Sequence, residues 1–306
     1  MGRPDFAERV AIVTGAGRGL GRAYALELAR RGAAVVVDDA DGECAAAVAA
    51  EIEAAGGRAA ACDASVADPE GAERIVATAG ERFGGLDAVV NNAGFMRNAY
   101  VEEMSVDDFD AVVATHLRGS FLVTRAAWPH LRERGGGRVV MTSSAGGMFA
   151  MQAECNYAAA KAGVYGLAKA LAFEGREHGI AVNTVLPMAT SRLESQSAVP
   201  DYDRHYPAAA REVLAPRRAV EPVVPLVAYL ASAACELSGE AFSVGFGRYA
   251  RVFVGETPGW VAPEGEAVEP EDVAGHLEKI RSPDGFSIPV DIYDEVDFIA
   301  SVLEGD

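Results

Sequence analysis

Short apolar segments alternate with alanine-rich helical segments from Val10 to Val244, and no other feature constrains the fold as strongly. The apolar segments are rich in β-branched residues and form mostly continuous runs. Strand sequences are continuously apolar when helices cover both faces of the sheet. We therefore predict an α/β fold with a parallel, doubly wound sheet of about seven strands. The expected strands are Val10–Thr14, Ala34–Val37, Arg58–Cys62, Leu86–Val90, Arg138–Thr142, Ile180–Leu186 and Ala241–Val244.

The segment after the first expected strand is rich in glycine and predicts a site for a nucleotide pyrophosphate. Gly15, Gly19 and Gly21 follow Val10–Thr14, and a helix is expected to open at about Leu20. Because glycine has no side chain, the turn can bend tightly and the backbone can approach the phosphates at the helix N-terminus. A glycine pattern alone is weak, but here it has the strand–turn–helix context that dinucleotide binding requires.

Asp39 ends the second strand, about twenty residues after the glycine turn, and favours NAD as the cofactor. A carboxylate at this position accepts hydrogen bonds from the adenosine ribose hydroxyls and repels the 2′-phosphate of NADP. Arg18 argues the other way, since a cation in the turn can bind a 2′-phosphate, unless it is simply a solvated turn residue. Repulsion beside the ribose is the more direct effect, so we predict NAD.

Polar residues also end the third and fourth expected strands. Asp63, followed by Ala64, stands where a carboxylate can bind the adenine amino group. Asn92, Ala93 and Gly94 end the next strand, where an amide side chain can hold neighbouring strands and the cofactor edge. Asp and Asn often only cap strands and turns. Their position at consecutive strand ends nevertheless favours a cofactor-binding role.

Ser144, Tyr157 and Lys161 form the predicted reacting centre. Because Lys161 follows Tyr157 by four residues, both side chains project from one face of a helix. A cation beside a phenol stabilises the phenolate, so we expect Lys161 to lower the pKa of Tyr157 from about 10. Ser144 ends the fifth strand and can hydrogen-bond a substrate oxygen. In this interpretation Tyr157 moves the proton, while Lys161 binds ribose hydroxyls and supplies a positive field.

Acidic residues outnumber basic ones by 45 to 27, which gives a formal net charge of −18. This charge repels nucleic-acid phosphates and anionic lipid, so we expect neither nucleic acid nor membrane as a partner. The N-terminus has no apolar leader segment, and no apolar stretch reaches transmembrane length. The four cysteines lie far apart without a CxxC pair, so we expect reduced thiols, no metal site and a cytoplasmic location.

These motifs resemble those of the short-chain dehydrogenase/reductase family, with TGAGRGLG, NNAG, Ser144 and YAAAK in the family's order and spacing. The resemblance implies a Rossmann-like fold and hydride exchange between a nicotinamide and a secondary alcohol or ketone. It also implies a homodimer or homotetramer acting on a small molecule. Pro187 and Thr190 stand where the family holds the nicotinamide carboxamide, although Pro-Met-Ala-Thr replaces the usual Pro-Gly.

The family normally has an asparagine in the long central helix, where it completes a proton relay. The matching segment of this chain, THLRG, has His116 instead. A histidine can also pass a proton. The alternative is a structural helix histidine whose ring bonds to the backbone.

A narrower resemblance covers nearly the whole chain. HLRGSFLVTRAAWPHL, MTSSAGG, NYAAAKAG and the tail around Pro270 look like the dehydrogenase part of peroxisomal D-type multifunctional enzymes. Those enzymes oxidise (3R)-hydroxyacyl-CoA with NAD, and some act on 17β-hydroxysteroids. No hydratase or sterol-carrier part follows, and the C-terminus is not a peroxisomal signal, so we expect a stand-alone relative.

We expect an NAD-binding catalytic domain over residues 1–250, with a substrate-covering loop at 191–222 rather than an idle connection. The loop carries five arginines that could bind the phosphates of CoA, namely Arg192, Arg204, Arg211, Arg217 and Arg218. Five acidic residues in the same segment offset their charge. Residues 251–306 should form an acidic helical extension, packed on the core or on a partner subunit, or a solvated cap. Helices are expected to begin at Pro270 and to cover Asp291–Leu303.

The leading interpretation is an NAD-dependent 3-hydroxyacyl-CoA or hydroxysteroid dehydrogenase. The second is a ketoreductase or alcohol dehydrogenase of specialised metabolism that acts on a cyclic or polyketide-like ketone. The third is a nucleotide-binding regulatory protein that has lost catalysis, since fold alone does not guarantee activity. The intact set of Ser144, Tyr157 and Lys161 argues against the third, because a non-catalytic binder gains nothing from a tuned phenol.

Overall fold

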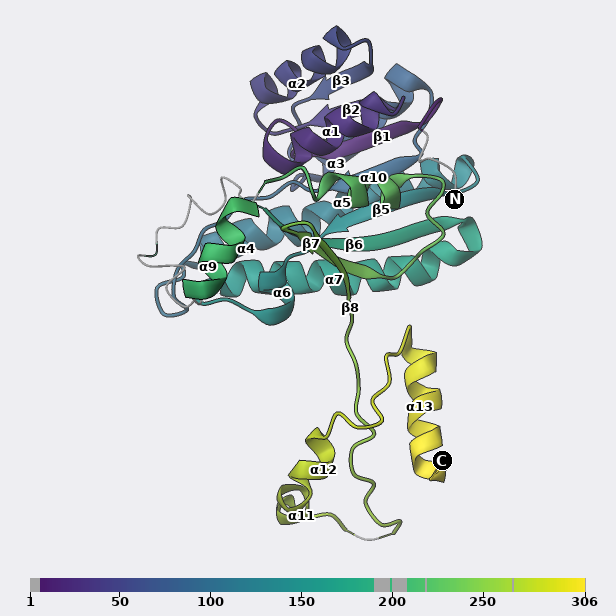
Figure 1. The fold of residues 1–306 in the computed structure, drawn as a ribbon. Helices are drawn as coiled ribbons and strands as arrows, with labels where there is room; N and C mark the ends of the chain where they lie inside the picture. Colours follow the sequence, from purple (N-terminus) through teal and green to yellow (C-terminus); the bar gives the residue numbers. More distant parts are fainter. Residues whose placement is uncertain (1–5, 190–198, 200–207, 218, 266, 306) are drawn as a thin grey trace. The chain divides into compact units, whose positions relative to one another are not determined.

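The computed structural model describes residues 6–189, 199, 208–217, 219–265 and 267–305. The chain divides into two compact units, Met1–Arg251 and Val252–Asp306. The first unit carries a sheet with helices on both of its faces (Figure 1). The second unit is helical.

Within the described residues the sheet has eight strands in the order β3-β2-β1-β4-β5-β6-β7-β8. The first seven strands along the chain pair in parallel. The order reverses between β1 and β4, the switch point at which doubly wound sheets bind nucleotides. The strands are β1 Val10–Thr14, β2 Ala34–Asp38, β3 Arg58–Cys62, β4 Ala88–Asn91, β5 Gly137–Thr142, β6 Ile180–Met188, β7 Ala241–Gly245 and β8 Arg248–Val252.

Helices α1, α2 and α10 pack on one face of the sheet, and α3, α5 and α7 pack on the other. The helices among the described residues of this unit are α1 Gly19–Arg30, α2 Gly42–Ala54, α3 Pro69–Phe83, α4 Val106–Val113, α5 Gly119–Glu133, α6 Ala145–Phe149, α7 Cys155–Gly175, α9 Ala208–Leu214 and α10 Val224–Ala231, with short 3-10 turns at Arg176–His178 and Ala215–Arg217. A π-helical turn, Ala114–Arg118, joins α4 to α5.

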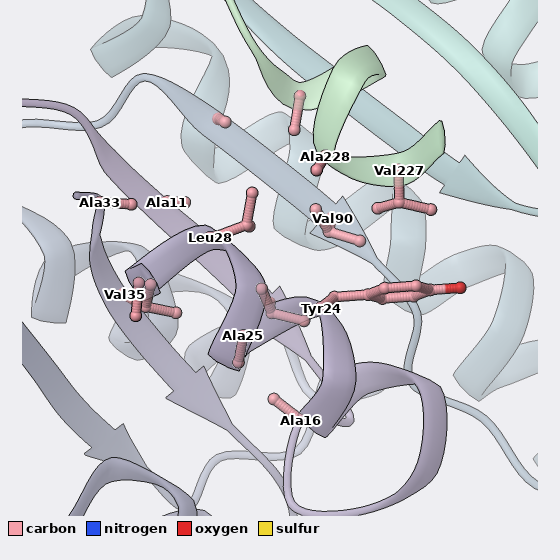
Figure 2. Packing of buried hydrophobic residues seen from close by; sticks show 14 of the residues in the cluster. Ala11, Ala16, Tyr24, Ala25, Leu28, Ala33, Val35, Val90, Val227 and Ala228 are labelled. Carbon is pink, nitrogen blue, oxygen red and sulfur yellow. The ribbon is translucent and has the colours of Figure 1, made fainter. Parts of the chain in front are cut away.

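Two apolar layers hold the sheet between its helices. In the layer shown in Figure 2, α1 presents Tyr24, Ala25 and Leu28 to side chains of the sheet and of α10, among them Val90 and Val227. Successive residues of β1 serve opposite layers, since Ala11 and Val13 lie in this layer and Val10 and Ile12 in the other. Burial on both faces explains why the strands read as continuous apolar runs.

The predicted α/β architecture is confirmed, and each of the seven expected strands is present with ends shifted by no more than two residues. The eighth strand, β8, was not predicted. It follows a two-residue turn at Phe246 and Gly247, both with positive φ, as hairpin turns of type I′ require. Because β8 is the last strand of the sheet and is largely exposed, it lacks the apolar run that marked the other strands.

Within residues 252–265 and 267–305 the second unit forms α11 Pro270–Gly275, α12 Leu277–Arg281 and α13 Ile292–Glu304. The predicted helix starts are confirmed. Helix α11 begins at Pro270, and α13 is capped by Asp291, whose side chain accepts from the backbone N–H groups of Tyr293 and Asp294. None of the described residues of this unit is buried. Its packing on the core or on a partner subunit therefore stays a prediction.

Candidate active site

The parallel register brings the predicted nucleotide-binding residues to one edge of the sheet. At that edge Thr14 pairs with Asp38, Asp38 pairs with Cys62, and Asn91 pairs with Met141. The carboxyl ends of parallel strands at a switch point are where open α/β sheets hold their ligands. The predicted residues that follow these strand ends are Gly15, Asp39, Asp63, Asn92 and Ser144.

The glycine turn is shaped as a cradle for an anion. A Cβ at Gly15, whose φ is +61°, would lie 2.7 Å from Ala93 Cα, and a Cβ at Gly21 would collide with the Gly15 carbonyl. Gly19 also has a positive φ, +53°, and faces open space. Helix α1 has no side-chain cap, because Arg18 at its N-cap makes no capping hydrogen bond. Its first N–H groups can therefore bind a phosphate, and the turn fits a dinucleotide. Leu20 packs against the core beneath the turn.

Asn92 fastens this turn to the end of β4. Its Nδ2 donates to the carbonyl oxygens of Thr14 and the next residue at 3.0 and 3.2 Å. In return, Thr14 Oγ1 accepts from the backbone N–H groups of Asn92 and Ala93 at 3.0 and 3.1 Å. Gly94 then passes so close to His116 that any side chain at this position would overlap the imidazole. The NNAG segment thus links the nucleotide edge to the reacting centre.

Asp39 lies beside the glycine turn. Its Oδ2 accepts from Gly17 N at 3.0 Å, and its Oδ1 accepts from Asp41 N at 3.0 Å. Arg18 forms an exposed ion pair with Asp41 at 2.5 Å. This pairing favours the interpretation of Arg18 as a solvated turn residue over that of a phosphate ligand.

Asp63 and Ala64 follow β3 in different environments. Asp63 is exposed and pairs with Arg74 at 3.1 Å, whereas Ala64 is buried and its backbone N–H bonds to the side chain of Asp38. Burial, together with the charge of Asp39, raises the pKa of Asp38 to about 8. We did not single out Asp38 from the sequence, although the pair Asp38–Asp39 at a strand end was visible there.

Ser144, Tyr157 and Lys161 lie together at the reacting centre. Ser144 Oγ accepts from Gly146 N at 3.1 Å, and the serine side chain also hydrogen-bonds Tyr157. Lys161 Nζ lies 5.7 Å from the centre of the Tyr157 ring and donates to Thr142 O at 2.6 Å. Tyr157 and Lys161 are both buried in α7.

Burial outweighs the neighbouring cation in setting the pKa of Tyr157. It raises that pKa to about 12; the Ser144 hydrogen bond lowers the pKa and the charge of Glu154 raises it further. Burial also lowers the pKa of Lys161 to about 7. The expectation that Lys161 lowers the pKa of Tyr157 is therefore wrong in this structure. The physical reason is that burial of the phenol disfavours the phenolate, while burial of Lys161 lowers its own pKa, so the ammonium group carries only part of its charge near neutral pH.

His116 lies in the π-helical turn between α4 and α5, and its side chain is buried. Its Nε2 is 2.7 Å from Phe95 O and 3.1 Å from Phe95 N, while its buried Nδ1 has no hydrogen-bond partner. Burial, with the charge of Lys161, lowers the pKa of His116 to about 3. The contacts match the structural alternative for this histidine, and its part in a proton relay stays a prediction. Widened π turns of this kind are frequent at functional sites.

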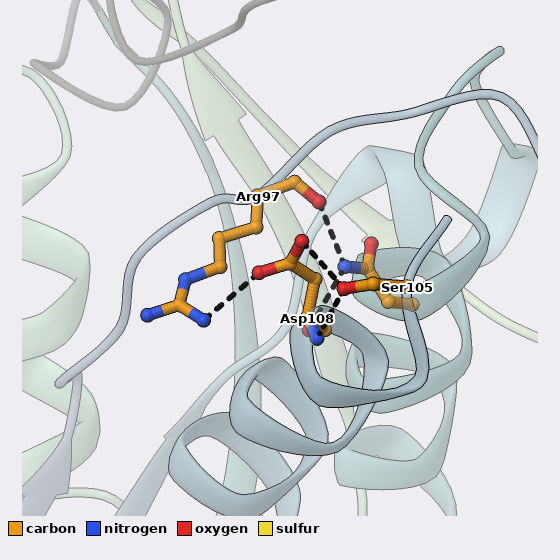
Figure 3. A network of polar contacts seen from close by, with 4 residues as sticks. Arg97, Ser105 and Asp108 are labelled. Carbon is orange, nitrogen blue, oxygen red and sulfur yellow. Dashed lines mark hydrogen bonds and ion pairs between the residues drawn. The ribbon is translucent and has the colours of Figure 1, made fainter. Parts of the chain in front are cut away.

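A polar network ties the N-terminal end of α7 to the loop after β4. Asn156, fully buried, donates from Nδ2 to Arg97 O at 2.8 Å and to Asp108 O at 3.3 Å. Its Oδ1 accepts from Tyr157 N at 2.7 Å. Figure 3 shows the Asp108 carboxylate between Arg97 and Ser105, which also caps α4. Asn156 thereby positions the backbone of Tyr157, a role that sequence analysis did not assign.

The remaining predicted site residues lie partly inside and partly outside the described ranges. Pro187 lies in β6, in register with Val244 of β7. Thr190 and most of the expected substrate loop, Arg192, Arg204 and Arg218 included, lie outside the described residues. Arg217 donates to Val213 O at 2.6 Å. Among the described residues no group of His, Cys, Asp and Glu could hold a metal ion, and no helix is long and apolar enough to cross a bilayer.

The fold and the two clusters define a class of protein: a nucleotide-binding α/β enzyme with a buried tyrosine–lysine pair at the switch edge of its sheet. Residues 9–201 match the family model described as short chain dehydrogenase. The chain belongs to the short-chain dehydrogenase family. Members of this family are oxidoreductases that use a nicotinamide cofactor and act on small molecules.

Individual proteins with similar sequences or structures can also be named. Peroxisomal multifunctional enzyme type 2 of Mus musculus is 41% identical over 97% of this chain, which spans only 40% of the mouse protein. Hydroxyacyl-CoA dehydrogenase ChsB1 of Mycobacterium tuberculosis is 41% identical over 78% of each chain. The full-length peroxisomal multifunctional enzyme type 2 of Drosophila melanogaster has a similar structure, with a TM-score of 0.80 and 31% identity over 98% of this chain and 50% of that one.

Proposed function

We propose that this protein is an NAD-dependent dehydrogenase that interconverts a secondary alcohol and a ketone, with a 3-hydroxyacyl-CoA as its substrate and a hydroxysteroid as the alternative. The observation that carries the proposal is the hydrogen bond between Ser144 and Tyr157 beside Lys161, at the sheet edge that also forms the glycine cradle. The name of the mycobacterial relative, a hydroxyacyl-CoA dehydrogenase, supports the acyl-CoA class.

The side chains of the reacting centre have separate tasks in this proposal. A bound nicotinamide would exchange a hydride with the carbinol carbon. Ser144 and Tyr157 would hold the substrate oxygen between their hydroxyl groups, and Tyr157 would take the alcohol proton on oxidation and return it on reduction. Because burial raises the pKa of Tyr157 to about 12, oxidation needs a deprotonated group that is scarce at neutral pH. Oxidation should therefore accelerate as pH rises, whereas reduction should not.

The preference for NAD rests on Asp39. Its carboxylate is held by the backbone of the glycine turn, and the nearby cation, Arg18, is already paired with Asp41. A 2′-phosphate at this position would meet a fixed negative charge, whereas the ribose hydroxyls of NAD can donate to the same oxygens. The expected cytoplasmic location and homo-oligomeric state stay predictions.

The test is NADH formation by the purified full chain. Substrates are (3R)- and (3S)-hydroxyacyl-CoA, a 17β-hydroxysteroid and simple secondary alcohols, each with NAD and with NADP. Turnover of one hydroxyacyl-CoA epimer with NAD would support the proposal. Turnover only of free cyclic alcohols would favour the ketoreductase alternative, and cofactor binding without any turnover would favour a regulatory protein.

Tyr157→Phe tests the assigned mechanism. We expect it to lower kcat by about two to four orders of magnitude, because the substitution removes the group that moves the proton. NADH binding, followed by fluorescence, should persist. Tyr229→Phe, on α10, is the matched control and should keep wild-type turnover. Full activity of Tyr157→Phe would contradict the mechanism.

A further inference from the structure

Glu154 places a second ionisable group at the reacting centre, one turn before Tyr157. It is 3% exposed. A Cβ built on Gly146 would lie 2.8 Å from Glu154 Oε2, 3.6 Å from Ser144 Oγ and 3.7 Å from Tyr157 Cε1. The carboxyl group, the serine hydroxyl and the phenol ring therefore surround one glycine, at which a side chain would collide with the carboxyl group.

Asn98, in the loop after β4, supplies an amide to the same cluster. Its side chain is 7% exposed, and neither Nδ2 nor Oδ1 has a partner of good hydrogen-bond geometry in the part of the chain that the structure describes. The amide is close enough to Glu154 to lower the pKa of that carboxyl group, but burial dominates and raises the pKa to about 7. A buried amide with both functions unpaired costs free energy, unless a ligand pairs with it.

The surroundings of Glu154 do not neutralise it. Within the described residues no charged partner perturbs the pKa of Glu154, and the ionisable groups gathered around the reacting centre are Tyr157, Lys161 and His116. Lys161 donates to Thr142 O, and His116 is bonded to Phe95. The hydrogen bonds of Asn156 already connect the loop after β4 to α7. Glu154 and Asn98 are therefore not needed to hold the loop on the helix.

We propose that Glu154 and Asn98 form a polar subsite that binds a second, uncharged oxygen of the substrate, a carbonyl or hydroxyl close to the reacting carbinol. The amide offers a donor and an acceptor to such an oxygen. A substrate carboxylate would instead face the carboxyl group of Glu154, which repels an anion in its ionised form and is partly ionised near neutral pH. The inference rests on the proposed dehydrogenase function and deepens it. The subsite would favour 3-hydroxyacyl thioesters and esters over the corresponding free 3-hydroxy acids as substrates.

The experiment compares three alcohols on the purified full chain with NAD: 2-butanol, methyl 3-hydroxybutyrate and 3-hydroxybutyrate. The variants are Glu154→Gln, which is nearly isosteric, and Asn98→Ala, with the exposed Glu53→Gln on α2 as the matched control. Asn98→Ala should lower the ratio of kcat/KM for the ester to that for 2-butanol by about tenfold, the effect of one lost hydrogen bond to a buried group. Glu154→Gln should raise the relative kcat/KM for 3-hydroxybutyrate by about tenfold, and Glu53→Gln should change neither ratio.

Variants that scale all three substrates by one factor, or leave both ratios unchanged, would overturn the subsite. If Asn98→Ala does not fold, the ratio measured with Glu154→Gln decides by itself. If the wild-type chain oxidises neither these alcohols nor the hydroxyacyl-CoA and steroid substrates of the first test, the proposed function fails. Calorimetry of methyl acetoacetate with the NADH complex then decides the subsite separately. If Asn98→Ala binds methyl acetoacetate about tenfold more weakly than the wild-type chain, the subsite is supported. If both bind it equally, or neither binds it, the subsite is overturned.

Discussion

The imidazole of His116 meets the phenol ring of Tyr157 edge to face, with ring centroids 5.2 Å apart and 87° between the ring planes. Edge-to-face pairs of this kind add packing specificity beyond the area they bury. Burial lowers the pKa of His116 to about 3, so the imidazole in this contact is uncharged at neutral pH. Protonation of His116 would place a buried charge against the phenol ring of Tyr157, the residue proposed to transfer the proton.

His116 should make stability depend on pH between about 6.5 and 3. In this window the unfolded histidine binds a proton that the folded one does not, so stability rises with pH and is lost as pH falls. We expect the wild-type chain to lose on the order of 2 kcal/mol more than His116→Asn between pH 7 and pH 4.5. Urea unfolding at both pH values measures this difference. His130→Asn, on α5, is the control, and equal losses in wild type and His116→Asn would contradict the prediction.

Asp39→Asn should weaken the discrimination between NAD and NADP. The amide keeps an oxygen for Gly17 N but removes the negative charge that faces a 2′-phosphate. We expect the ratio of kcat/KM for NAD to that for NADP to fall by about tenfold or more. Steady-state kinetics with both cofactors checks this, with the exposed Asp107→Asn on α4 as the control. An unchanged ratio would show that another group selects the cofactor.

Asn156→Ala should impair both stability and turnover. It leaves Arg97 O, Asp108 O and Tyr157 N without their buried partner. We expect the free energy of unfolding to fall by about 2–3 kcal/mol, measured by urea denaturation. Because Tyr157 loses its backbone support, kcat should fall while KM for NAD changes little. A variant that loses stability but keeps the wild-type kcat would restrict Asn156 to a purely structural role.

Tyr24→Phe should leave stability equal or raise it by about 1 kcal/mol, an unusual outcome for a core substitution. The side chain is 1% exposed, and its hydroxyl group has no hydrogen-bond partner among the described residues. Removing an unpaired buried hydroxyl removes a desolvation cost. Tyr24→Leu, which also opens a cavity in the layer of Figure 2, should instead destabilise the chain by about 2–4 kcal/mol. Thermal unfolding of both variants compares them, and a destabilised Phe variant would reveal a partner for the hydroxyl.

Local chemistry determined much of this protein. Covered strands require continuous apolar runs, so seven strands could be predicted. The helix starts at Pro270 and Asp291 could also be predicted from the residues there. Tyr157 and Lys161 share a helix face because of their spacing alone. The glycines predicted a cradle because a positive φ and close backbone approach are properties of single positions.

Only the tertiary structure decided how these groups behave together. Asn98 and Glu154 are 56 residues apart in the sequence and become neighbours through the packing of a loop on α7. Burial reverses the expected pKa shift of Tyr157, and a π turn buries His116 against the same ring. Residue spacing specifies which side chains share a face, whereas hydration depends on every element that covers that face. The position of the reacting groups could therefore be predicted from the sequence, and their protonation could not.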